Sequence, residues 1–166
     1  MRAGFSDRTN DEFLQEVLTK VNELRAKHGS PPLTLDPELV EYAKSRAAFM
    51  AEKDDLTHEG LRSGTGENAS KASASSGPAA ASGTDAVEGW YAENSNYDYT
   101  TGKKIDPDPY KAIGHFTALV WKSTTKIGVG RVAGQSGQWW DTYIVANFSP
   151  PGNMGGQYVM NVVPAS

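Results

Sequence analysis

The order of hydrophobic patterns along this chain predicts an α+β fold in which a sheet lies between helical layers. Apolar residues recur at helical spacing in the first half, and two strand-like runs flank a glycine-rich turn near the C-terminus. The second run is apolar on both faces, which is typical of a central strand covered on each side. Helices followed by strands are characteristic of α+β folds.

Two helices are predicted in the first third of the chain. Thr9 and Glu12 form a capping-box pattern at the start of the first helix, and Gly29 ends it. Asp36 and Pro37 suit the N-cap and first turn of the second helix. Apolar residues at helical spacing form the inner faces: Phe13, Val17, Val21 and Leu24 in the first helix, and Leu39, Ala43, Ala47 and Met50 in the second.

The helical pattern is lost between residues 54 and 83. Small residues dominate 69–83, which is expected to be a flexible surface loop. Thr84 is expected to cap a short helix that extends to about Asn94. A long loop over 95–114 and a short helical segment over 115–121 follow.

The last third of the chain predicts a hairpin. Residues 127–132 and 139–148 have the character of strands, with turn residues at 134–137 between them, and 158–163 could add a last strand. We expect one domain with one core over residues 1–166, with a flexible N-terminus over 1–9.

Composition excludes several classes of site. The chain has no cysteine, so disulfides, thiolate metal sites and cysteine nucleophiles are ruled out. The net charge of −4 argues against nucleic-acid binding. No apolar run reaches the roughly 18 residues of a membrane span, and the first residues lack the apolar region of a signal peptide. Whether a leader has been removed stays open.

Six separated motifs give the chain a family resemblance. They are NELRAKHGSPPL at 22–33, L-x-x-x-A at 39–43, GEN at 66–68, VEGWY at 87–91, GHFTALVWKST at 114–124 and YIVANFSPPGN at 143–153. In this order they resemble the motifs of the CAP superfamily (cysteine-rich secretory proteins, antigen 5 and pathogenesis-related protein 1). The lack of cysteine and the IGVG run at 127–130 look most like the Golgi-associated plant pathogenesis-related protein branch. The resemblance implies an α-β-α sandwich.

The resemblance also implies a central cavity lined by His58, Glu67, Glu88 and His115. The two histidines would bind a divalent metal, zinc in particular, through neutral imidazoles, and the two glutamates would support them as hydrogen-bond acceptors. Two protein ligands leave positions for water, so the affinity is expected to be modest. The third histidine, His28, is expected to cap the first helix.

Other functions stay open beside this one. A metal-bound water with Glu67 or Glu88 as base would give a hydrolase. The four residues could instead form a structural cluster without metal. The chain could also be a secreted defence or virulence module that acts through protein contacts and has a vestigial cavity.

A lipid-binding surface is a further expectation from the family. Tyr97 and Tyr99 match the first half of the aromatic loop of sterol-binding members, but Lys104 stands where the next aromatic residue is expected. Ile105 and Tyr110 could still contribute to an apolar surface. The expected partners are therefore a sterol, a fatty acid or an anionic membrane.

The sequence thus favours a non-enzymatic binding protein, present as a monomer or a weak homodimer. The family suggests secretion, with a cytoplasmic or peripheral Golgi location as the alternative.

Overall fold

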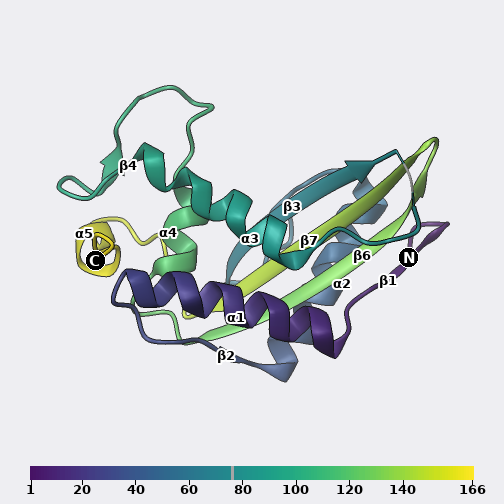
Figure 1. Cartoon of the computed structure of the whole chain (residues 1–166), viewed down its shortest axis with the longest axis horizontal. Helices are drawn as coiled ribbons and strands as arrows, with labels where there is room; N and C mark the ends of the chain where they lie inside the picture. The colour runs from purple at the N-terminus through teal and green to yellow at the C-terminus, as the bar shows by residue number, and fades with distance from the viewer. Residues whose placement is uncertain (76) are drawn as a thin grey trace.

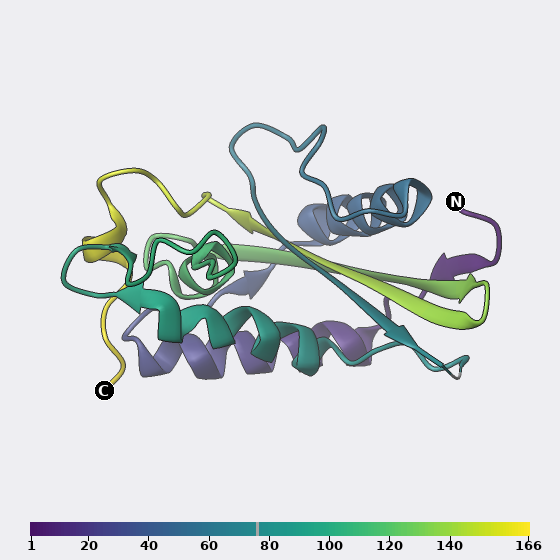
Figure 2. The same ribbon diagram turned by 90° about the horizontal axis from the view of Figure 1, so that it is seen from above.

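A single mixed sheet lies between helices in the computed structural model of the chain, which describes residues 1–75 and 77–166. Helix α2 (Pro37–Lys53) covers one face of the sheet, while α1 (Asp11–Lys27) and α3 (Gly83–Tyr91) lie on the other (Figures 1 and 2). The predicted three-layer α-β-α sandwich is confirmed.

The main sheet has the strand order β1-β6-β7-β3, and β2 pairs in parallel with the start of β6. Its strands are β1 (Phe5–Asp7), β2 (Thr34–Leu35), β3 (Gly66–Ala74), β6 (Lys126–Ser136) and β7 (Trp139–Ser149). The remaining elements are the 3-10 helix η1 (Ala92–Asn96), the small hairpin of β4 (Tyr97–Asp98) and β5 (Lys103–Lys104), and helices α4 (Gly114–Val120) and α5 (Tyr158–Asn161).

Strand β7 divides the core into two parts, as its two apolar faces predicted. Ile144 and Ala146 pack with α1, α3 and α4, whereas Tyr143 and Val145 pack against α2. Neighbours β6 and β3 pair with β7 along its length, so it is the central strand expected from the sequence.

The start of α1 corrects the predicted capping box. Asn10 is the N-cap, and its side chain accepts a hydrogen bond from the backbone N–H of Phe13 at 2.8 Å. The Thr9 hydroxyl instead bonds the backbone of Arg131 in β6, so it serves the sheet. The start of α2 is as predicted, because Asp36 accepts bonds from the N–H groups of residues 38 and 39.

The expectation of a flexible loop over 69–83 is wrong for residues 69–74. They belong to β3, which pairs with β7 from Gly66 through Ala74. Most side chains of this strand are small, so backbone hydrogen bonds to β7 hold it in the sheet. The sequence therefore lacks the alternation of apolar and polar residues that predicts a strand. Residue 76 of the expected loop lies outside the described residues.

Four further expectations are corrected. Residues 1–9 are not a flexible end, because β1 pairs with β6 and Phe5 is buried. Ser82 rather than Thr84 caps α3, which ends at Tyr91 and continues as η1. The hairpin strands extend to residue 136 and resume at 139, so the turn is shorter than expected. Residues 158–161 form helix α5 instead of a last strand.

His28 is the C-cap of α1, as predicted, but it is also fully packed. Its Nδ1 lies 2.7 Å from the Val163 carbonyl oxygen, and its Nε2 lies 2.8 Å from the Tyr91 hydroxyl. The neutral ring satisfies both contacts if Nδ1–H donates and Nε2 accepts. Burial therefore holds the pKa of His28 below its usual 6.5.

This depressed pKa predicts a loss of stability in mild acid. Between the folded-state pKa and 6.5 the unfolded chain takes up a proton that the folded chain does not, so the free energy of unfolding should fall as the pH drops below 6.5. Urea unfolding across this range measures the slope. A His28→Gln variant should be less stable throughout but have a shallower slope; an equal slope would contradict the assignment.

Candidate functional site

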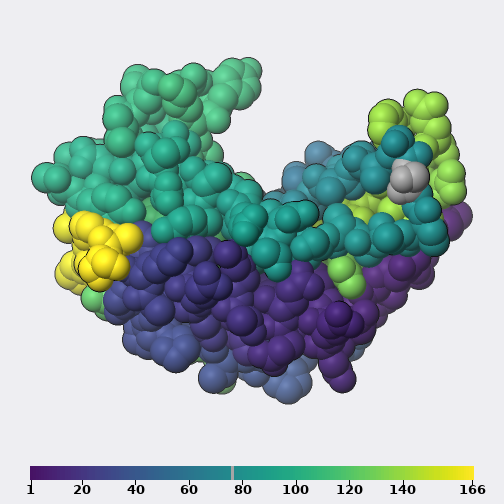
Figure 3. Space-filling view, in the orientation of Figure 1, coloured from purple at the N-terminus to yellow at the C-terminus, as the bar shows by residue number. Residues whose placement is uncertain are grey.

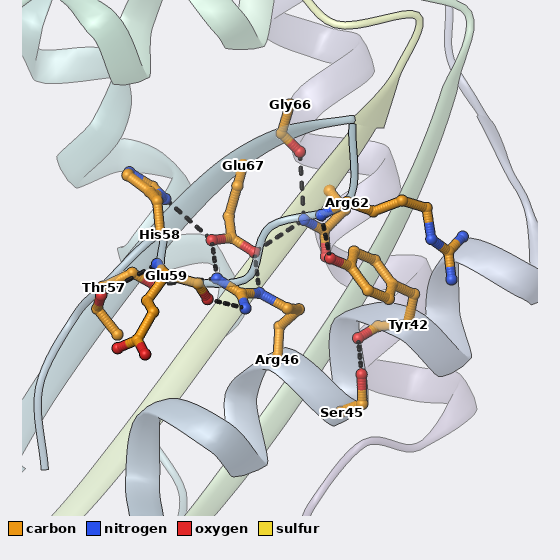
Figure 4. A network of polar contacts seen from close by, with 10 residues as sticks. Tyr42, Ser45, Arg46, Thr57, His58, Glu59, Arg62, Gly66 and Glu67 are labelled. Atoms are coloured by element: carbon orange, nitrogen blue, oxygen red, sulfur yellow. Dashed lines mark hydrogen bonds and ion pairs between the residues drawn. The ribbon is translucent and has the colours of Figure 1, made fainter. Parts of the chain in front are cut away.

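His58 lies in the segment between α2 and β3 and points its Nδ1 at a buried carboxylate. The distance from Nδ1 to Glu67 Oε1 is 2.9 Å. The His58 side chain is 60% exposed, whereas the side chain of Glu67 is fully buried at the start of β3. Figure 4 shows the ring and the carboxylate facing each other.

Glu67 is held from three sides. Arg46 of α2 donates to both oxygens, at 2.8 Å to Oε2 and 2.9 Å to Oε1, and Asn147 of β7 donates to Oε2 at 3.0 Å. Burial alone would raise the pKa of Glu67, but hydrogen bonds from Arg46, His58 and Asn147 outweigh it and hold the pKa below its usual range. Glu67 is therefore an ionised acceptor whose oxygens are already engaged.

His115 is supported in a different way, at the start of α4. Glu93 of η1 accepts bonds at Oε1 from the backbone N–H of His115 at 2.8 Å and of Phe116 at 3.3 Å. Its Oε2 lies 2.7 Å from the ring Nδ1 of His115. These bonds outweigh burial and lower the pKa of Glu93. One carboxylate thus caps α4 and orients the imidazole.

The expected cavity role of Glu88 is corrected by this geometry. Glu88 lies in α3 with its side chain 56% exposed, and it pairs with Lys20 of α1 at 3.4 Å. The sequence contained the signal for Glu93, because residues three apart share a helical face. Trp90 faces His115, and Glu93 follows Trp90 by three positions, whereas Glu88 precedes it by two.

The two histidine arms, His58 with Glu67 and His115 with Glu93, both contact β3, the outer strand of the sheet. The Trp90 indole N–H donates to the Ala69 carbonyl at 3.1 Å, and the Trp90 ring stacks on His115 with centroids 6.5 Å apart. The Asn68 side chain donates to the His115 carbonyl at 3.0 Å. The start of α4 is therefore fixed to the residues that directly follow Glu67. Figure 3 shows a broad hollow between the 92–113 segment and the far end of the sheet.

The two imidazoles share a pattern of hydrogen bonding. A carboxylate only accepts, so Nδ1 of each ring carries a proton; in the neutral form of each ring the lone pair is then on Nε2. Within the described residues, no hydrogen bond involves Nε2 of His58 or of His115. The same part of the chain contains no group of three or more acidic or histidine side chains arranged to hold a metal. Within this part of the chain, each neutral ring therefore has Nε2 as the nitrogen without a hydrogen bond.

The four residues of the expected lipid loop do not act as one surface. Tyr97 is 2% exposed in the core, and Tyr99 packs on it with ring centroids 5.0 Å apart. Ile105 and Tyr110 are 64% and 94% exposed. The structure thus places two of the residues inside the domain and leaves two at the surface. Within the described residues no helix has the length and apolar character to cross a membrane.

Comparison with known proteins adds a family to this geometry. The family model "CAP: Cysteine-rich secretory protein family" matches residues 18–148. The human Golgi-associated plant pathogenesis-related protein 1 is 36% identical, over 92% of this chain and 94% of its own length. Secreted protein RBT4 of Candida albicans is 33% identical over 92% of this chain, which spans only 38% of that relative. The solved structure of NaASP2 with Zn²⁺ has a TM-score of 0.69 and 22% identity, over 100% of this chain and 90% of that one, which shows the shared fold.

The contrast between Glu93 and Glu88 gives a direct test of the site geometry. Glu93→Ala removes three hydrogen-bond contacts at the start of α4 and is expected to lower the free energy of unfolding by about 2 kcal/mol. Glu88→Ala removes one exposed ion pair and should change it by less than about 0.5 kcal/mol. Urea unfolding measures both. Equal losses in the two variants would contradict the assignment of Glu93.

Proposed function

Because the chain belongs to the CAP family, we propose that it is a non-enzymatic binding protein whose His58 and His115 hold a divalent cation, with zinc as the best fit. One observation carries this proposal. Each imidazole is backed at Nδ1 by a buried or half-buried carboxylate and keeps Nε2 for a ligand. Carboxylate-backed histidine is the usual arrangement around protein-bound zinc.

The donor set suits zinc in kind, and it leaves the remaining coordination positions to water. Zinc takes neutral imidazole nitrogen readily and completes its tetrahedron with water. Two protein ligands favour modest affinity that falls in acid, because both rings must be neutral to bind. The NaASP2 structure with Zn²⁺ shares this fold and is in keeping with the proposal. A bound cation would supply a positive centre held by the two Nε2 atoms.

The carboxylates favour binding over hydrolysis. A general base needs an oxygen within hydrogen-bond reach of the water it activates. Glu67 engages both oxygens with Arg46, His58 and Asn147. Glu93 engages both with His115 and the first amides of α4. Two carboxylates with lowered pKa and occupied oxygens are suited to orient rings, so the hydrolase is the less supported alternative.

Calorimetric zinc titration of the metal-free protein at pH 7.5 tests the proposal. We expect one saturable site per chain, weakened by about tenfold or more in His58→Ala or His115→Ala and lost in the double variant, because each change removes one of two protein ligands. Glu88→Gln is the matched control and should bind as the wild type does. If the double variant bound zinc with unchanged affinity, the proposal would fail. Turnover of a peptide substrate that is abolished by Glu67→Gln would instead favour the hydrolase.

A membrane surface is a second candidate partner, favoured by the exposure of Ile105 and Tyr110. Both lie in the segment that follows Lys103 and Lys104, so apolar and basic groups are adjacent. Asp106 and Asp108 offset part of the charge, since Lys111 pairs with Asp106 at 2.9 Å. Binding would therefore rely more on insertion of the two apolar side chains than on the attraction of lysines to anionic lipids, which contributes only about 1 kcal/mol per lysine.

Sedimentation with vesicles rich in phosphatidylserine tests this second candidate. Ile105→Ser/Tyr110→Ser should lower the bound fraction by about tenfold, because it removes the apolar area available for insertion. Trp139→Ser removes a partly exposed aromatic side chain at the hairpin and is the matched control. Equal binding by both variants would exclude the loop as the contact. Vesicles containing a sterol distinguish a sterol ligand from an anionic surface.

The place of action is also a proposal. Relatives whose names specify secretion or the Golgi favour an extracellular or Golgi-associated protein. A recognition module that acts through protein contacts would give neither zinc binding nor vesicle binding in the two experiments above.

A further inference from the structure

We propose that Arg46 is a positioning residue that fixes the orientation of the His58 imidazole. Its guanidinium holds the carboxylate behind His58 and also the backbone on both sides of His58. The effect of Arg46 on the ordering of His58 stands by itself. Its effect on cation affinity rests on the function proposed above.

The contacts of Arg46 surround His58. Nε and Nη2 donate to the two oxygens of Glu67, at 2.8 and 2.9 Å. Nη1 donates to the Glu59 carbonyl at 2.6 Å, and Nη2 donates to the Thr57 carbonyl at 3.0 Å. These carbonyls belong to the residues immediately before and after His58. Figure 4 shows the guanidinium between the carboxylate and this backbone.

The His58 segment needs such an anchor. Residues 54–65 contain no helix or strand, and most of the His58 side chain is exposed. In the described part of the chain, the hydrogen bonds that join residues 57–59 to the body of the domain go to Arg46 and Glu67. Glu67 itself depends on Arg46 for two of its bonds. Arg46 therefore acts on both routes that fix the imidazole: directly on the backbone beside His58, and through Glu67, which Asn147 also holds.

Arginine is required by this geometry and not only by its charge. The side chain is 6% exposed and belongs to α2, so it reaches the carboxylate and both carbonyls from a rigid helix. A guanidinium presents five N–H donors in one plane, which matches a bidentate carboxylate together with two further acceptors. A lysine ammonium in the same place would keep the charge but could not span all four oxygens.

The second arm does not use Arg46. Glu93 and the start of α4 hold His115, and the guanidinium has no contact there. Loss of Arg46 should therefore disorder one imidazole and spare the other. This selectivity separates a positioning role from a general loss of stability.

The test compares Arg46→Lys and Arg46→Gln with Arg62→Gln in the metal-free protein. Arg62 is the matched control because it lies in the same segment but stacks on Tyr42 and touches neither Glu67 nor the two carbonyls. Amide hydrogen exchange reports on residues 57–61, and long-range proton–nitrogen correlation spectra report the tautomer of each imidazole. Zinc titration of the same samples gives the affinity.

We expect both Arg46 variants to exchange at least about tenfold faster at residues 57–61 and to lose the fixed Nδ1–H tautomer of His58, with the His115 ring unchanged. Zinc affinity should fall by about 10–100-fold, to the level of His58→Ala. Arg46→Lys keeps a positive charge beside Glu67, so it supplies a folded protein should Arg46→Gln unfold. Arg62→Gln should match the wild type in all three measurements.

Wild-type exchange and a fixed His58 ring in Arg46→Lys would overturn the inference. So would equal changes at His58 and His115, which would mean general loosening. A disordered His58 ring that bound zinc with wild-type affinity would overturn the link to the cation. Disordering of His58 in the variants together with no zinc binding by the wild type would support the positioning role and reject the proposed function.

Discussion

The buried guanidinium of Arg25 is the contact on which the arrangement of the helical layer depends. It is fully buried near the end of α1 and donates to the carbonyls of Pro31, Leu119, Trp121 and Thr124 at 2.8–3.0 Å. Burial lowers the pKa of Arg25 to about 10, so it stays charged at neutral pH. These bonds offset the cost of burying a charge and fix the end of α4 to α1. The start of α4, where His115 lies, is thereby directed towards the sheet.

The two histidine arms are built on this frame by different means. His115 lies in the first turn of α4, and Glu93 binds both its backbone N–H and its ring Nδ1. The carboxylate that caps the helix therefore also orients the imidazole. His58 lies on an irregular segment that depends on Arg46 and Glu67. One arm is set by secondary structure and the other by a buried ion pair. Sequence-distant residues meet because β3, α3 and α4 converge at the outer edge of the sheet.

Periodicity and cap residues predicted the parts of the fold that rest on hydrophobic burial, such as β7 and the Asp36 cap of α2. They could not identify β3, because its side chains are mostly small and the strand is held by backbone pairing with β7, which leaves no hydrophobic pattern in the sequence. The resemblance pointed to Glu88, but Glu93, three positions after Trp90, is the carboxylate that contacts His115. Arg46 was missed because a charged residue on a helix is normally solvated. Its position between Ala43 and Ala47 on the inner stripe of α2 was the available signal.

Diffraction from a crystal of the zinc-loaded protein, measured at the zinc absorption edge, is the decisive test of the two-histidine site. We expect one anomalous peak within about 2.0–2.1 Å of Nε2 of both His58 and His115, with other positions filled by water. The Nδ1 contacts to Glu67 and Glu93 should be retained. A peak bound by Glu67 or Glu93, or at a place remote from both rings, would contradict the claim that these carboxylates orient a two-histidine cation site.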